Sequence, residues 1–218
     1  MGSGTTSCKW DTVIPFEPLW KQYKRIIKDN GAIVLTASQP FTSALVMSNP
    51  TWFRYDLVWI KTKASNFQNA HKMPMKRHED VLIFYNRMPT YNLDLQLLNK
   101  PIKSSRKNKG SNLGHCVDQG NYYQKYTGYK FTDIYYPNPS GIGHYHPTQK
   151  PVALFEYLIR TYTNEGDLVL DNCAGSGTTG IAALNTKRKA ILIETDAGYC
   201  EIIRKRLRQH QSQESLAL

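Results

Sequence analysis

Asp171-Asn172-Cys173-Ala174-Gly175-Ser176-Gly177-Thr178-Thr179 joins a short apolar run, 167–171, to a stretch with helical spacing, 178–184. A strand, a glycine-rich turn and a helix in this order predict that a ligand approaches the bare backbone at Gly175 and Gly177. Glu194 closes the next apolar run, where a carboxylate can accept hydrogen bonds from both ribose hydroxyls of an adenosine ligand. The turn therefore predicts an α/β fold that binds the adenosine half of a cofactor.

The nature of that cofactor depends on the flanking residues. Gly175, Gly177 and Gly180 together match the dinucleotide fingerprint G-x-G-x-x-G, so NAD is an alternative ligand. Thr178 and Thr179 would crowd a pyrophosphate, which weighs against a dinucleotide.

The apolar spacing outward from this turn predicts an alternation of strands and helices. Helices are expected over 16–29, 40–47, 151–162, 178–184 and 197–209, and strands over 32–36, 55–60, 80–85, 167–171 and 190–194. The alternation predicts a parallel sheet. The polar stretch 61–79 is expected to be a functional loop, and the residues after His210 are expected to fray.

Composition narrows the class of protein. The 218 residues contain 28 Lys and Arg against 17 Asp and Glu, a net charge of +11 that favours polyanions such as nucleic acid. Because there is no long apolar run and no signal-peptide pattern at the first residues, we expect a cytoplasmic protein without a membrane segment.

The cysteines Cys8, Cys116, Cys173 and Cys200 form no CxxC pair, so no metal site is expected.

His146-Pro147-Thr148-Gln149-Lys150-Pro151, followed by the glycine turn, resembles motifs X and I of the β-class N6-adenine and N4-cytosine DNA methyltransferases. The resemblance covers nearly all of residues 4–207. Trp59-Ile60-Lys61 and His78-Glu79 resemble the segment from the sixth to the eighth motif, near the target-base pocket. One departure is Asp171-Asn172-Cys173, where the family usually has Asp-Pro-Phe.

The resemblance implies a Rossmann-like class I methyltransferase sheet with helices on both faces, and S-adenosylmethionine as the cofactor. It assigns residues 4–90 to a catalytic half, 91–145 to a target-recognition insert, 146–210 to the cofactor-binding half and 211–218 to a polar tail. The cofactor contacts that it implies are His146, Thr148, Lys150, Asp171, Cys173, Gly175, Ser176, Gly177, Thr178 and Glu194.

Double-stranded DNA is the macromolecular partner that the resemblance implies. Basic groups supply sequence-independent affinity for phosphates, and the insert combines such groups with many tyrosines. For the asparagines a loop-capping role is an equal alternative, and for the basic run a solvated loop is the alternative. The predicted DNA contacts are Lys61, Asn66, Asn69, Lys103, Arg106, Lys107 and Lys109.

The family's catalytic Asp-Pro-Pro-Tyr-like tetrapeptide is not found in the sequence, so no catalytic residue is predicted. Its expected place is just before residues 4–11. The family's strand leading into it lies beside the strand that ends at Asp171, so we expect an unpaired strand edge that favours a homodimer or a complementing N-terminal fragment.

Four functions stay open at this point. N6-adenine methylation of a flipped DNA base is preferred, and N4-cytosine methylation is the alternative within the same family. A non-catalytic or split-enzyme fragment would bind DNA or cofactor without turnover. An RNA or protein methyltransferase is disfavoured by the order of the motifs.

Overall fold

The computed structural model of the chain describes residues 12–104, 122–139 and 145–216. The chain divides into two compact units, which are described separately. The larger consists of residues 1–92 with 132–218, and the smaller of residues 93–131.

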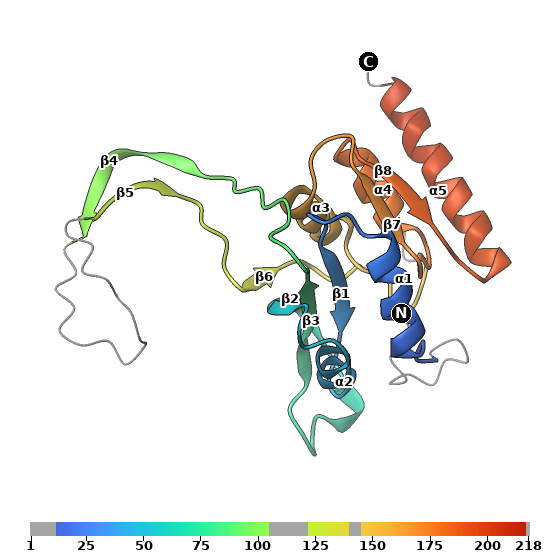
Figure 1. Ribbon diagram of the computed structural model, residues 1–218. Helices are drawn as coiled ribbons and strands as arrows, with labels where there is room; N and C mark the ends of the chain where they lie inside the picture. Colours follow the sequence, from blue (N-terminus) through green and yellow to red (C-terminus); the bar gives the residue numbers. More distant parts are fainter. Residues whose placement is uncertain (1–11, 105–121, 140–144, 217–218) are drawn as a thin grey trace. The chain divides into compact units, whose positions relative to one another are not determined.

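A four-stranded sheet forms the centre of the larger unit (Figure 1). Its order is β1-β3-β2-β6, with β1 at Ile33–Ala37, β2 at Phe53–Ser65, β3 at Lys76–Phe84 and β6 at Asp133–Tyr135. β3 runs antiparallel to both β1 and β2, and β6 runs parallel to β2. In this register Trp59 lies opposite Glu79, which places both side chains on one face of the sheet.

Helices cover both faces of this sheet, as the resemblance implies. Leu82 and Phe84 pack in one cluster with residues of α1 (Phe16–Ile26) and α2 (Phe41–Ser48). Val81 and Ile83 point the other way and pack against α3 (Val152–Tyr162). All four of these β3 residues are at most 1% exposed, because a strand sends alternate side chains to opposite faces and both faces are covered.

The expectation of a parallel sheet is wrong for this part of the chain. The residues of β1 were expected to form a strand of a parallel sheet because strands and helices alternate, yet β1 pairs antiparallel with β3. A continuous apolar run reports burial on both faces, and helices on the two sides provide that burial whatever the direction of the neighbouring strand.

A second sheet carries the glycine turn. β7 (Leu168–Asp171) and β8 (Lys189–Leu192) are parallel, which confirms that expectation here. They lie beside α4 (Thr178–Asn185) and α5 (Ala197–Leu216) (Figure 1). α5 continues past His210, the residue after which fraying was expected, to Leu216. Among the described residues β7 pairs only with β8, and Leu168 and Leu170 are 54% and 38% exposed.

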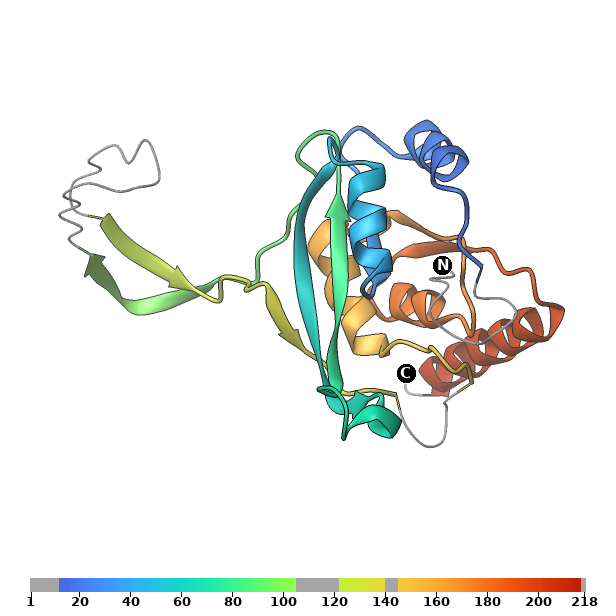
Figure 2. The ribbon, with the colours of Figure 1, turned by 90° about the horizontal axis from the view of Figure 1, so that it is seen from below.

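The stretch expected to be a loop, 61–79, is mostly a β-hairpin. β2 continues to Ser65 and β3 begins at Lys76, and the short 3-10 helix η1 (Phe67–Asn69) lies at the turn (Figure 2). Both strands are polar here because the outer part of the hairpin faces solvent, so the apolar signal for a strand is absent although the backbone pairing persists.

The smaller unit is built on an antiparallel ribbon of β4 (Gln96–Ser104) and β5 (Tyr122–Thr127). Several apolar side chains of this unit are strongly exposed, among them Leu97 at 71% and Phe131 at 73%. No helix in the described part of the chain is long and apolar enough to cross a membrane.

Candidate functional site

The glycine loop, residues 172–177, is fixed at its base by Asp171. The Oδ1 atom of Asp171 accepts a hydrogen bond of 3.0 Å from the backbone N–H of Cys173. Its Oδ2 atom accepts a hydrogen bond from the hydroxyl of Thr179, in the first turn of α4. One carboxylate therefore ties the strand, the loop and the helix together.

Gly175 and Gly177 have positive φ values of 52° and 80°, which disfavour any residue with a Cβ atom. A Cβ at Gly177 would lie 3.0 Å from Cγ1 of Ile203 on α5. A Cβ at Gly175 would lie 3.5 Å from the ring of His146. The glycines are therefore required by backbone conformation, and at Gly177 also by the packing of α5.

Glu194 follows β8 and reaches back to the glycine loop. Its Oε2 atom accepts a hydrogen bond of 2.8 Å from the N–H of Gly175. Its Oε1 atom accepts hydrogen bonds of 2.8 Å and 3.0 Å from the N–H groups of Thr195 and Asp196. The carboxylate is thus held beside the loop, and Oε2, with one bond from Gly175, has the capacity to accept a second bond from a ligand hydroxyl.

Residues 146–150, here called the bridging segment, pack against the glycine loop. The His146 ring is 9% exposed and its centroid lies 4.5 Å from that of Tyr199. Gln149 accepts a hydrogen bond of 2.9 Å from the Ser176 hydroxyl. The motif that resembles motif X is therefore in contact with the one that resembles motif I.

The bridging segment is also tied to the four-stranded sheet. Nζ of Lys150 donates a 2.6 Å hydrogen bond to Oε2 of Glu79 on β3, and Lys61 on β2 donates to Oε1 of the same carboxylate. Both ammonium groups lie over the Trp59 ring, with Nζ 5.2 Å from the centroid for Lys61 and 5.8 Å for Lys150. These four side chains form the lysine–glutamate cluster.

The electrostatics of the cluster favour a charged carboxylate. Burial raises the pKa of Glu79, but the ammonium groups of Lys150 and Lys61 outweigh it and hold the pKa below its usual value. The side chains of Lys61, Glu79 and Lys150 are only 11%, 16% and 19% exposed. Glu79 is therefore ionised, and it links the bridging segment to the four-stranded sheet.

The predicted site residues differ in their surroundings. His146, Thr148, Lys150, Asp171, Cys173, Gly175, Ser176, Gly177, Thr178 and Glu194 lie on the glycine loop, the bridging segment and the adjoining ends of β7, β8 and α4. Asp171 holds the loop, and the Lys150 ammonium group points to Glu79. Lys61 does not project into solvent as expected of a DNA contact, because Glu79 and Trp59 hold it.

The predicted DNA contacts are spread over both units. Asn69 donates a 2.7 Å hydrogen bond to Oδ1 of Asn66, whose φ of 70° is left-handed, so these two side chains bind each other at the hairpin turn. Lys103 lies exposed on β4, opposite Tyr123. Arg106, Lys107 and Lys109, like residues 4–11, lie outside the described residues.

Several residues that support the site were not selected from the sequence. The Tyr23 hydroxyl on α1 donates a 2.9 Å hydrogen bond to Oδ1 of Asn172. Arg206 on α5 donates to the carbonyl of Ser176, and its guanidinium group lies 4.9 Å from the centroid of the Tyr145 ring. Gln149 lies within the motif 146–151, so its role could have been predicted from the sequence. The role of Tyr23 could not, because its partner Asn172 is distant in sequence.

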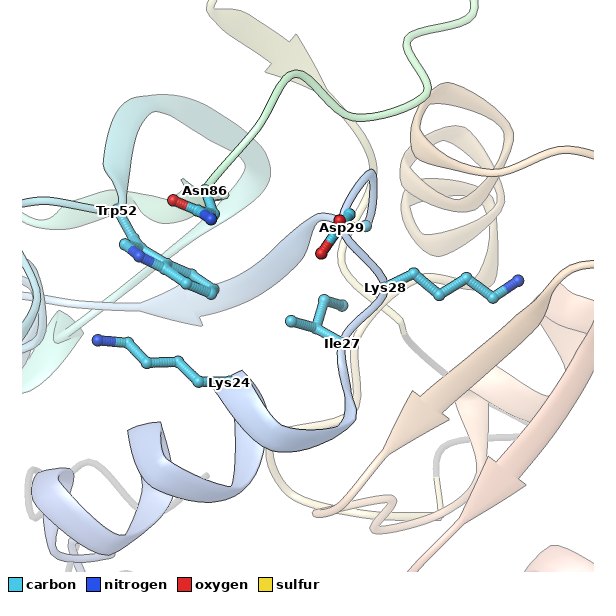
Figure 3. A pocket seen from close by; sticks show the side chains of 7 residues that line it. Lys24, Ile27, Lys28, Asp29, Trp52 and Asn86 are labelled. Atoms are coloured by element: carbon cyan, nitrogen blue, oxygen red, sulfur yellow. The ribbon is translucent and has the colours of Figure 1, made fainter.

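A small pocket of about 120 Å³ lies elsewhere in the larger unit (Figure 3). Lys24 lies over the Trp52 ring there, 5.1 Å from its centroid. None of the glycine-loop residues line it, so it is separate from the candidate site. Its lining consists of Lys24, Ile27, Lys28, Asp29, Gly31, Trp52 and Asn86.

Known proteins resemble this chain over most of its length. It is 27% identical over 214 residues to the type II methyltransferase M.HpaI of Haemophilus parainfluenzae, covering 94% of this chain but 63% of that protein. A shorter match, 47% identical over 74 residues, is to the DNA adenine methyltransferase YhdJ of Escherichia coli, covering 33% of this chain and 25% of that protein.

Solved structures share the fold. The crystal structure of an M1.HpyAVI–SAM complex matches with a TM-score of 0.60 and 26% identity, covering 89% of this chain and 85% of that chain. The cytosine-N4-specific PvuII DNA methyltransferase matches with a TM-score of 0.64 at 17% identity, covering 92% of this chain and 74% of that chain, which shows likeness of fold.

The family model described as DNA methylase matches residues 1–205. The glycine loop, the bridging segment and the fold agree with that match. This chain therefore belongs to the N6/N4 DNA methylase family.

Proposed function

We propose that this chain binds S-adenosylmethionine at the glycine loop and takes part in methyl transfer to an exocyclic amine of a flipped DNA base. The observation that carries the proposal is the contact of Glu194 with Gly175 beside the bridging segment, which gathers polar groups at the glycine loop. The M1.HpyAVI structure, whose title names a SAM complex, supports this choice of cofactor.

The residues around the loop fit the parts of that cofactor. Oε2 of Glu194 is placed to accept from a ribose hydroxyl. The first turn of α4, at Thr178 and Thr179, offers N–H groups and the positive end of the helix dipole to the methionine carboxylate. When bound, the cofactor supplies an electrophilic methyl group, and the chain's own residues hold and orient it.

DNA binding is assigned by this proposal mainly to the smaller unit. Its ribbon exposes Tyr123 and Tyr126 at 51% and 42%, together with Lys100, Lys103 and Lys125. Cations that contact phosphates and aromatic rings that stack on bases are the combination that nucleic-acid surfaces use. This supports the target-recognition role expected of the insert.

Adenine N6 is the preferred acceptor. YhdJ, one of the relatives, is by its name a DNA adenine methyltransferase. Its match covers a third of this chain and supports the preference for adenine. Cytosine N4 is the second candidate, because the PvuII enzyme with the same fold is cytosine-N4-specific by its title.

The cofactor proposal is tested by titrating S-adenosylmethionine into the purified chain by calorimetry. Gly177→Asp should abolish binding, because it adds a side chain and a negative charge inside the loop. Gly166→Asp is the matched control, since Gly166 has a similar φ of 83° but has open space around it and lies before β7. Loss of binding in both variants, or in neither, would contradict the proposed site.

A second proposal is a non-catalytic or split-enzyme role, in which the chain binds DNA or cofactor without turnover. Among the described residues β7 has a strand on one edge only, which supports association with a second copy or a complementing polypeptide. Transfer of a radiolabelled methyl group from S-adenosylmethionine to duplex DNA distinguishes the two roles. Cofactor binding without transfer would favour the non-catalytic role.

A further inference from the structure

The tip of the β2–β3 hairpin, residues 65–76, exposes apolar side chains in a cationic setting. Phe67 is 79% exposed, and Met73 and Met75 are 52% and 45% exposed. The sequence from 62 to 78 contains no Asp or Glu but includes Lys63, Lys72, Lys76 and Arg77. Apolar side chains surrounded by cationic groups suit a ligand that has both negative charge and flat apolar surface. DNA has both, in its phosphates and in its stacked bases.

Hydrogen bonds within the tip hold Phe67 in this exposed position. Asn69 bonds to Asn66, and Nδ2 of Asn66 lies 3.2 Å from the sulfur of Met73. The backbone N–H groups of Lys72 and Met73 bond to the carbonyl of Asn69 at 2.8 Å and 3.0 Å. The backbone that carries Phe67 is therefore part of a hydrogen-bonded turn.

The hairpin is attached to the proposed cofactor site at its base. Glu79, three residues beyond Lys76, accepts a hydrogen bond from Lys150 of the bridging segment. The bridging segment in turn contacts the glycine loop through the bond between Gln149 and Ser176. Beyond this point the hairpin continues to η1 at its end (Figure 2). The tip is therefore connected to the proposed cofactor site through the hairpin itself.

We propose that Phe67 is an apolar wedge that enters the base stack of duplex DNA and fills the gap left by the base that is turned out. This rests on the proposed function. Apolar side chains inserted between base steps are a known means of unstacking DNA, and an aromatic ring replaces part of the lost stacking. Lys72 and its cationic neighbours contact the phosphates on either side, and Phe67 makes the stacking contact.

The proposal is tested with the full chain and two duplexes of the same sequence, one intact and one with a single abasic site that leaves a gap in the stack. Affinities are measured by fluorescence anisotropy at low salt. We expect the gapped duplex to bind roughly tenfold more tightly. Phe67→Ala should remove this preference while leaving the affinity for intact DNA within about twofold, and Phe67→Trp should keep it.

Two control variants distinguish stacking by Phe67 from binding of phosphates by lysine and from the effect of any other exposed apolar side chain. Lys72→Ala should weaken binding to both duplexes and preserve their ratio. Met47→Ala removes another exposed apolar side chain, 71% exposed on α2, and should change neither affinity. Thermal unfolding of each variant checks that the fold is retained.

A preference for the gapped duplex that persists in Phe67→Ala, or no preference in the wild type, would overturn the wedge although DNA binding stands. Absence of binding to either duplex would overturn the proposed DNA function, and the wedge with it. Binding to anionic phospholipid vesicles that depends on Phe67, without a preference between duplexes, would overturn the proposal in favour of a membrane contact.

Discussion

Lys150 Nζ donates a 2.6 Å hydrogen bond to Oε2 of Glu79, and this pair joins the bridging segment to β3. Glu79→Gln keeps the shape but leaves two largely buried ammonium groups without a carboxylate. We expect a loss of about 2 kcal/mol in unfolding free energy, below the ~3–5 kcal/mol of a fully buried pair because Glu79 is partly exposed, and weaker binding of S-adenosylmethionine. Urea unfolding and calorimetry measure the two effects.

The matched control for this change is Lys61→Met, which leaves Glu79 paired with Lys150 and should keep cofactor affinity. If Glu79 acts through Lys150, the double variant Glu79→Gln with Lys150→Met should bind the cofactor as weakly as Lys150→Met alone. Additive losses in the double variant would contradict this coupling.

The same carboxylate gives the chain a pH-dependent stability. The pKa of Glu79 in the folded protein lies below its value in the unfolded chain, so its contribution is present above the unfolded pKa and is lost as the pH falls through the folded pKa. We expect the stability difference between the wild type and Glu79→Gln to shrink as the pH falls below the ordinary pKa of a glutamate. Urea unfolding at several pH values tests this, and a constant difference would count against it.

The hydrogen bond from Tyr23 to Asn172 fixes the start of the glycine loop. Tyr23→Phe should cost about 1 kcal/mol of stability and also weaken cofactor binding. Tyr55→Phe is the matched comparison, because it removes a 2.9 Å hydrogen bond to Tyr162 away from the loop. It should lower the Tm by a similar amount and leave cofactor affinity unchanged. Equal affinities in both variants would show that Tyr23 has no part in shaping the loop.

The exposed face of β7 should promote association between chains. Leu168 and Leu170 lie on it, and on β8 Ile191 is 47% exposed. Leu168→Lys places a charge on this face and should reduce concentration-dependent association in sedimentation velocity. Met47→Lys, a similar change on α2, should not reduce it. Association that is equal in both variants would exclude this face as the contact.

The sequence was most informative where structure is set by neighbouring residues. The glycine turn requires left-handed backbone at Gly175 and Gly177, and their spacing predicts it directly. Glu194 could be predicted because it closes the apolar run that follows that turn, and its carboxylate accepts a hydrogen bond from Gly175.

Features made by distant residues could not be predicted in this way. The outer part of the β2–β3 hairpin is polar, so it carries no apolar signal for a strand. Lys61 was predicted to contact DNA because Trp59-Ile60-Lys61 resembles the family segment near the target-base pocket, and only the folded chain brings Glu79 and Trp59 to it. The direction of β1 was likewise decided by pairing with β3, far along the chain.

The bond between Tyr23 and Asn172 also has an evolutionary consequence. Asn172 stands where the family usually has proline, whose side chain offers no acceptor for the Tyr23 hydroxyl. A lineage that carried proline at this position would lose the selective advantage of a tyrosine on α1, and phenylalanine would serve there equally well. We therefore expect the two positions to covary among descendants of a common ancestor, although 149 residues of chain separate them.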